Sequence, residues 1–351
     1  MRLHFFIFLI FIFTCCENQP RQVKIIQADA PLEKLSDYNF FVGKMADLQP
    51  NDRVLPYDLN SPLFSDYAHK SRFVWIPENQ PATFGKKGEV LNFPYGSILI
   101  KTFYYNNDER DLSVGQRIIE TRLLIKGKEK WEAHGYTWNE EQTEAYLDIV
   151  GDIKEVSWVN KEGKKLFVDY IIPNKNQCKG CHYKDGILSP IGPKVQNLNK
   201  DYVYGESSKN QLKQWSEMGY LADYQPNTDY EKVAQWDNPT NGTLHERAMA
   251  YLDINCGHCH NPQGPANTTG LNLVADAEMN IALGINKPSV AAGAGTGGFT
   301  YNISPGHPEE SILIYRMKSQ KPAEMMPELG RRLIHEEGVK LIADWINEME
   351  E

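Results

Sequence analysis

The sequence predicts a multidomain protein in which an N-terminal, mainly-β, sandwich-like domain is followed by a C-terminal all-α region. Its 351 residues are enough for two or three domains, each with a core of its own. Between residues 55 and 172, short β-rich runs alternate with turn residues. After Pro173 this pattern stops, and apolar residues recur at helical spacing in several of the segments that follow.

Residues 1–16 have the pattern of an export signal. A short positive start at Arg2 precedes an unbroken apolar run at residues 5–13, which is too short for a bilayer span of about 20 residues. The run is followed by Cys15 and Cys16, at the place where a bacterial lipoprotein is cut and acylated. We expect Cys16 to carry a lipid anchor, and signal cleavage without lipid is the alternative. Both alternatives place the protein in the periplasm or at the outer cell envelope.

The next segments are expected to be a tether and the β-rich domain. Residues 17–54 are polar and contain three prolines, which is typical of a tether with at most one short helix. Residues 55–172 form the β-rich domain, where strands are expected at 72–76, 96–105, 117–125, 131–136, 144–149, 153–159 and 166–171. Short strands at near-regular spacing favour a β-sandwich or a related antiparallel domain.

Two copies of the pattern Cys-x-x-Cys-His indicate the chemistry of this chain. One runs from Cys178 to His182 and the other from Cys256 to His260. In c-type haem attachment, two thiols within one turn add to the haem vinyl groups, and the next residue's imidazole takes the proximal position on the iron. The sequence therefore predicts two covalently attached haem c groups, with His182 and His260 as proximal iron ligands. The four thiols expected to attach them are Cys178, Cys181, Cys256 and Cys259.

Cysteine usage supports this interpretation. Four of the six cysteines lie in the two motifs, and the other two lie in the export signal. A chance origin of both motifs is therefore improbable, and no cysteine remains for a structural disulfide, although an exported protein would permit one.

Residues 241–351 are expected to form a cytochrome c-like domain around the second haem. Thr243 and Glu246 make a capping pattern for a helix at 244–255, and an apolar stripe predicts a closing helix at 336–350. Between these helices, Met326 directly precedes Pro327 on a loop. A thioether in this position is suited to the distal side of the iron, so Met326 is the expected distal ligand, and core filling is its alternative role. His258, between the two cysteines, is expected to face solvent at the haem edge.

Residues 173–222 form the first haem segment, with a helical pattern at 209–221, and residues 223–240 are expected to be a linker. The distal ligand of the first haem is left open by the sequence. Met218 ranks first. His69 and His134 of the β-rich domain, a lysine, or an open iron are the alternatives.

Several stretches carry a resemblance to a known family. Residues 247–271, 305–313 and 326–330 resemble a family of uncharacterised exported di-haem c-type cytochromes. Residues 55–67, 120–123 and 136–140 are similar to that family's N-terminal module, so the resemblance covers nearly the whole mature chain. It implies haem binding and electron transfer in the periplasm. Members of the family are similar to proteins found near β-helix repeat proteins, and no substrate is established for them.

The composition indicates which kinds of partner the protein can bind. The chain is 41% hydrophobic and 24% charged, which is ordinary for a soluble globular protein, and its net charge of -9 includes no basic stripe for nucleic acid. We expect redox partner proteins, with membrane contact only through the lipid anchor.

The expected function is transfer of single electrons between such partners, without a substrate or catalytic residues of the protein's own. One alternative is a di-haem peroxidase-like enzyme with an open first haem. The other is the electron-accepting subunit of a carbohydrate or small-molecule dehydrogenase.

Overall fold

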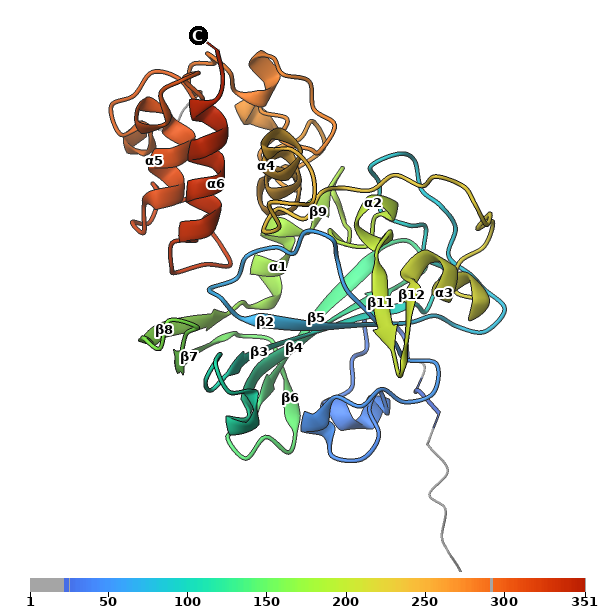
Figure 1. Ribbon diagram of the computed structural model, residues 1–351. Helices are drawn as coiled ribbons and strands as arrows, with labels where there is room; N and C mark the ends of the chain where they lie inside the picture. Colours follow the sequence, from blue (N-terminus) through green and yellow to red (C-terminus); the bar gives the residue numbers. More distant parts are fainter. Residues whose placement is uncertain (1–21, 25, 291–292, 351) are drawn as a thin grey trace, which may run out of the picture.

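The computed structural model describes residues 22–24, 26–290 and 293–350, and its N-terminal half is built on a six-stranded antiparallel sheet (Figure 1). The strands pair in sequence order and are β1 (Leu55–Tyr57), β2 (His69–Trp75), β3 (Ile98–Asn106), β4 (Gln116–Lys126), β5 (Trp131–Trp138) and β6 (Ala145–Asp148). A separate hairpin consists of β7 (Asp152–Val159) and β8 (Lys165–Ile172). All seven expected strands are confirmed. The export signal and Cys16 lie outside the described residues.

The described part of the segment expected to be a tether, residues 22–24 and 26–54, is folded against one face of the sheet. It contains short 3-10 helices at Leu35–Tyr38 and Met45–Asp47. Its aromatic and aliphatic side chains, Tyr38 and Phe40 among them, are buried with Phe73 and Tyr136 of the sheet. The hydroxyls of Tyr38 and Tyr136 lie 2.8 Å apart. A few large side chains therefore fix a segment whose overall composition is polar.

The opposite face of the sheet, which we call the motif face, has a mixed cover. At one end the β7–β8 hairpin packs Trp158 and Tyr170 on Phe103 and Tyr105. At the other end lies a segment whose central side chain is Trp215. The second layer of the expected sandwich is thus not one continuous sheet, because the rest of this face is covered by a segment of short helices and small separate hairpins.

That covering segment is more irregular than its helical pattern suggested. It contains α2 (Val195–Leu198) and α3 (Gln211–Glu217), with two small hairpins made of β9 (Tyr183–Lys184), β10 (Ile187–Leu188), β11 (Asp201–Tyr204) and β12 (Ser207–Asn210). The helix expected at 209–221 begins later, because the Asn210 side chain accepts hydrogen bonds from the backbone N–H groups of Leu212 and Lys213 and so acts as its N-cap.

Three helices form the C-terminal region, α4 (Leu244–Leu252), α5 (Ile312–Lys318) and α6 (Glu336–Asn347), and they group above the sheet in Figure 1. The Thr243–Glu246 capping box is present, and α4 continues into a π-helical turn at Asp253–Gly257. Helices α4 and α6 approach closely because Gly338 has no side chain, and a Cβ there would overlap the Tyr251 ring. Short 3-10 helices lie at Leu112–Val114, Asn267–Thr269, Ile281–Leu283, Gly293–Thr296 and Pro308–Glu310.

The segment expected to be a linker is packed between the two regions. The Trp236 indole donates to the Pro62 carbonyl at 3.2 Å. Nearby, Asn255 accepts a hydrogen bond from the Phe64 backbone at 2.8 Å, and Lys194 pairs with buried Asp253 at 2.9 Å. The C-terminal region is therefore fixed to the sheet by specific polar contacts. None of the described helices has both the length and the hydropathy that a membrane span requires.

Candidate functional site

The two Cys-x-x-Cys-His motifs are held by different local structures. The first lies at the end of α1 (Lys175–Cys181), a helix that begins with a capping box formed by Asn174 and Gln177 and that has His182 as its C-cap. The second lies where the π-helical turn after α4 ends. All four motif cysteines carry free thiols, and none of them is fully buried. Both motifs thus present their thiols within one helical turn.

The fold brings the two motifs into contact, although they are far apart in the sequence. The Cys259 thiol lies 3.5 Å from the Gly180 carbonyl and donates to it. The backbone N–H of Asp185, just beyond the first motif, donates to the carbonyl of Gln263, just beyond the second, at 3.0 Å. The interaction of the neighbouring Cys181 and Cys259 thiols lowers the pKa of Cys181 and raises that of Cys259. Groups attached at the two motifs would therefore be neighbours.

His182 is held in the tautomer that a metal ligand requires. Its Nδ1–H donates to the Ser189 carbonyl at 2.9 Å, so Nε2 is the nitrogen that remains for a metal. Burial lowers the pKa of His182 to about 4, which keeps the imidazole neutral at physiological pH.

His260 reaches the same state through a side chain. Its Nδ1 lies 3.1 Å from the Thr269 hydroxyl oxygen, and that hydroxyl donates to the Ala266 carbonyl at 2.7 Å. Because the hydroxyl proton is used by Ala266, the hydroxyl oxygen accepts from His260 Nδ1–H and Nε2 again remains. Burial lowers the pKa of His260 to about 4. Neither Ser189 nor Thr269 was singled out from the sequence.

The Met326 loop is fixed by an arginine that sequence analysis missed. Arg331 is only 5% exposed. Its guanidinium donates to the Met326 carbonyl at 2.8 Å and to the Ser319 carbonyl at 2.9 Å. The Met326 N–H donates to the Arg316 carbonyl at 3.0 Å. On the same loop, Leu329 lies so close to Gly180 that an added Cβ there would meet it at 2.9 Å. This loop of the C-terminal region therefore also contacts the first motif.

The candidates for the distal side of the first motif already have contacts of their own, and Cys178 packs against the same Trp215 cluster as Met218. Met218 is the C-cap of α3 and packs against the Trp215 cluster. His69 Nε2 lies 2.7 Å from a Glu109 carboxylate oxygen, and His134 Nε2 donates to the Ala28 carbonyl at 2.7 Å. The Nε2 nitrogen of each of these histidines therefore already has a partner.

His258 lies beside the first motif as well as within the second. It is partly exposed, and its Nδ1–H donates to the Ile254 carbonyl at 3.2 Å. Together with Cys181 and His182 it lines a pocket of about 250 Å³ between the motifs. The His258 side chain of the second motif thus lies next to residues of the first motif.

Four cations on the motif face were also missed. Arg72, Lys101 and Arg122 are direct cross-strand neighbours on β2, β3 and β4, and Lys70 lies two residues before Arg72 on the same face. The charge of Arg122 acts on the Cys178 thiol, and the charge of Lys101 acts on His182. The first motif therefore stands above a strongly basic part of the sheet.

The donor set of both motifs fits a covalently attached haem. Each supplies two free thiols within one helical turn and one neutral imidazole with Nε2 available. Among the described residues, the only grouping of three His, Cys, Asp or Glu side chains with metal-ligand geometry is His307, Glu309 and Glu310, away from both motifs.

Comparison with known proteins adds nothing to these observations, since no family model, curated protein or solved structure matches the chain.

Proposed function

We propose that this protein is a di-haem c-type cytochrome that transfers single electrons between redox partner proteins outside the cytoplasm. The observation that carries the proposal is the contact between the two Cys-x-x-Cys-His motifs, in each of which the histidine Nδ1 is occupied and Nε2 is available. A bound haem supplies one-electron chemistry. The chain supplies the attachment thiols of Cys178, Cys181, Cys256 and Cys259, and the iron-binding nitrogens of His182 and His260.

The proposal extends to the C-terminal region as a cytochrome c-like domain. Support comes from the order of its parts: a capped helix that leads into the second motif, a pinned loop with Met326, and a closing helix that crosses the first one at Gly338. Met326 is the proposed distal ligand of this haem. Membership in the family of exported di-haem c-type cytochromes, export by residues 1–16 and anchoring through Cys16 belong to the same proposal, and the sequence alone supports them.

Electron transfer is favoured over an enzymatic role because the motifs lie side by side. Adjacent haems pass electrons readily between themselves, and residues of both motifs line one pocket. The redox partners themselves are not identified by these contacts.

The test is to produce the protein in an exporting host that matures c-type cytochromes and to measure haem that survives denaturation. Two covalent haems per chain, both six-coordinate and low-spin, are expected. A chain without covalent haem would refute the proposal. One five-coordinate iron together with peroxide turnover would favour the peroxidase-like enzyme instead.

A further inference from the structure

The four cations of the motif face, which we call the cation row, hold more positive charge than their neighbours balance. It consists of Lys70, Arg72, Lys101 and Arg122. Like charges on directly opposite residues of a sheet repel each other, and here Lys101 has an arginine on each side. Such an arrangement is costly unless anions compensate it.

Two carboxylates compensate only part of this charge. Glu120, which is fully buried, binds Arg122 through two contacts of 2.5 and 2.7 Å. Asp58 binds Arg72 at 2.8 Å but is shared with Lys200, also at 2.8 Å. The balance around Arg72 is therefore incomplete.

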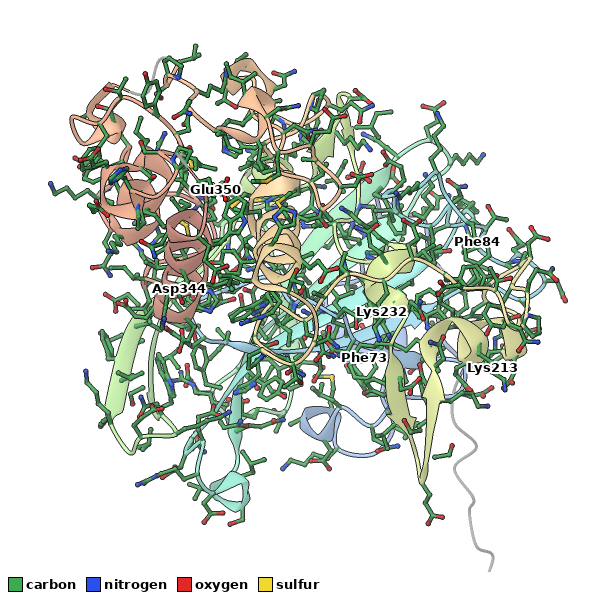
Figure 2. All side chains as sticks on the ribbon, turned by 45° about the horizontal axis from the view of Figure 1, so that its top comes forward. Phe73, Phe84, Lys213, Lys232, Asp344 and Glu350 are labelled. Atoms are coloured by element: carbon green, nitrogen blue, oxygen red, sulfur yellow. The ribbon has the colours of Figure 1, made fainter. Side chains whose placement is uncertain are left out.

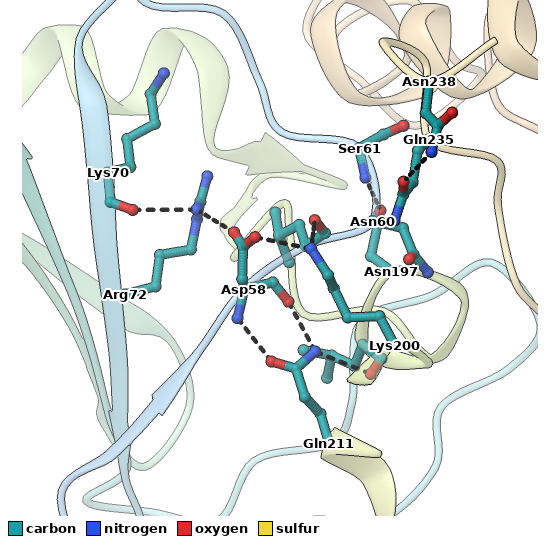
Figure 3. A network of polar contacts seen from close by, with 12 residues as sticks. Asp58, Asn60, Ser61, Lys70, Arg72, Asn197, Lys200, Gln211, Gln235 and Asn238 are labelled. Atoms are coloured by element: carbon teal, nitrogen blue, oxygen red, sulfur yellow. Dashed lines mark hydrogen bonds and ion pairs between the residues drawn. The ribbon is translucent and has the colours of Figure 1, made fainter. Parts of the chain in front are cut away.

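Among the described residues, the two lysines of the row and one nitrogen of Arg72 have no carboxylate partner. Figure 3 shows Lys70 and Arg72 side by side, with dashed lines joining Arg72 to Asp58 and to the Lys70 carbonyl. The second terminal nitrogen of Arg72, Nη2, has no hydrogen-bond partner. It is also shielded from water, because this side chain is only 5% exposed. The Lys101 ammonium lies over the Phe103 ring, 4.8 Å from its centre, and forms no ion pair within the described chain.

Burial and the repulsion among the four cations lower the pKa values of both lysines, Lys70 and Lys101. Burial, followed by the charges of Arg72 and Arg122, lowers the pKa of Lys70 to about 7. The same causes hold the pKa of Lys101 well below its usual range. A bound anion would relieve both effects, because it would restore the charged form of each ammonium group.

We propose that the cation row is a carboxylate-binding site for the propionate groups of the haem attached at Cys178 and Cys181. This inference rests on the proposed function. Haem carries two propionates on the edge opposite the vinyl groups that the thiols use, so a haem held by this motif would bring two carboxylates that need cationic partners. The unpartnered nitrogen of Arg72 and the Lys101 ammonium are donors of the kind that carboxylates bind.

The test compares the two haem midpoint potentials in the whole matured protein. A positive charge near a haem stabilises the reduced iron, and a propionate left without its partner stabilises the oxidised iron. Lys101→Met should therefore lower the potential of one haem, with a tenfold fall in its reduced-to-oxidised ratio equal to 59 mV, and leave the other unchanged. Lys101 has no carboxylate partner in the described chain, so this variant leaves no buried acid unpaired.

Two controls accompany this variant. Lys101→Arg should retain the original potential. Lys213→Met removes the same charge from α3, and Figure 2 shows Lys213 on the side of the molecule away from the C-terminal helices that carry Asp344. It should also change neither potential.

Three results are informative. Unchanged potentials in Lys101→Met, with two haems present, would overturn the inference and leave the proposed function intact. Fewer than two covalent haems in the unaltered protein would instead refute the proposed function. Finally, a saturable shift of the potential by inorganic phosphate, absent from Lys101→Met, would assign the row to a free oxyanion and overturn the propionate assignment.

Discussion

The first motif ends a seven-residue helix that stands over a charged part of a sheet, whereas the second follows a longer helix embedded in an apolar cluster. Around the first, the charges of Arg122 and Lys101 on the sheet act on Cys178 and His182. Around the second, Cys256 packs against a core that includes Leu252 and Ile342. The same five-residue pattern is thus placed in a basic environment once and in an apolar environment once.

This difference bears on how the two proposed haems are controlled. A haem over the basic sheet would be governed by charges that lie beside it. A haem among helices would be governed mainly by its iron ligands, because it would lie against an apolar core and because Arg331 fixes the loop that carries Met326. The comparison therefore predicts that charge substitutions affect the first haem and ligand substitutions affect the second.

Removing each pair of attachment cysteines should produce the largest effect. Replacement of Cys178 and Cys181 by alanine is expected to leave one covalent haem per chain, and so is replacement of Cys256 and Cys259. Mass spectrometry of the intact chain measures this directly. The two variants should also differ in spectrum, since each retains the haem that the other lacks. Loss of both haems in either variant would mean that the two environments do not form independently.

Met326→Leu tests the ligand side of the comparison. Leucine keeps the apolar volume but removes the thioether, so the potential of the second haem should fall by on the order of 0.1 V, a fraction of the range that axial ligands span. Met325→Leu is the matched control, because Met325 is the buried neighbour on the same loop. Equal effects of the two substitutions in redox titrations would contradict the assignment of Met326.

His335 tests the contact between the two regions. It lies at the start of α6, and its ring stacks on Phe64 of the sheet region at 4.1 Å. Burial lowers the pKa of His335 to about 3. Below about pH 6.5 this histidine is therefore protonated in the unfolded chain but stays neutral in the folded chain. Stability from this group is present above pH 6.5 and is lost as the pH falls toward 3, by about 2 kcal/mol between pH 7 and pH 5.

Urea unfolding at the two pH values measures this loss. His335→Gln keeps a polar side chain for the hydroxyl of Tyr251, which lies 3.0 Å from His335 Nδ1, but it does not titrate. The variant should therefore lose about 2 kcal/mol less than the unaltered protein over the same interval. Identical pH dependence in both proteins would show that His335 is not kept neutral at this contact.

The sheet could be predicted from the sequence because its strands are local patterns bounded by turn residues. Long strands such as β4 are rich in residues that favour strands, and connections such as the one at Gly127 are short. The fold of the segment at 22–54 could not be predicted, because Tyr38 and Phe40 are few among polar residues and their partners lie on distant strands. Composition alone does not reveal such docking.

In the candidate site, too, some residues could be predicted from the sequence and others could not. The motif cysteines and histidines could be named because their spacing is local in the sequence. The cation row could not, because Arg72, Lys101 and Arg122 become neighbours only through the register of three strands. The contact between the motifs depends equally on tertiary structure, since it requires the docking that Lys194 and Asp253 help to fix.

The smallest expected effect concerns the groups that hold the two histidines. Thr269→Val removes the side-chain acceptor of His260 Nδ1–H, which makes the imidazole a weaker donor to the iron and destabilises the oxidised state. The potential of the second haem should therefore rise, by on the order of tenfold in the reduced-to-oxidised ratio. Thr269→Ser keeps the hydroxyl and should retain the original value.

Ser189→Ala is the counterpart at the first motif, and it should change nothing, because His182 donates to the main-chain carbonyl of Ser189 and not to its side chain. Redox titration of the three variants therefore probes the two histidines with the same kind of substitution. If Ser189→Ala moved the first potential as far as Thr269→Val moved the second, the hydrogen bonds would not be the cause. A response confined to Thr269→Val would instead show that the imidazole of the second motif alone is held by an exchangeable side chain.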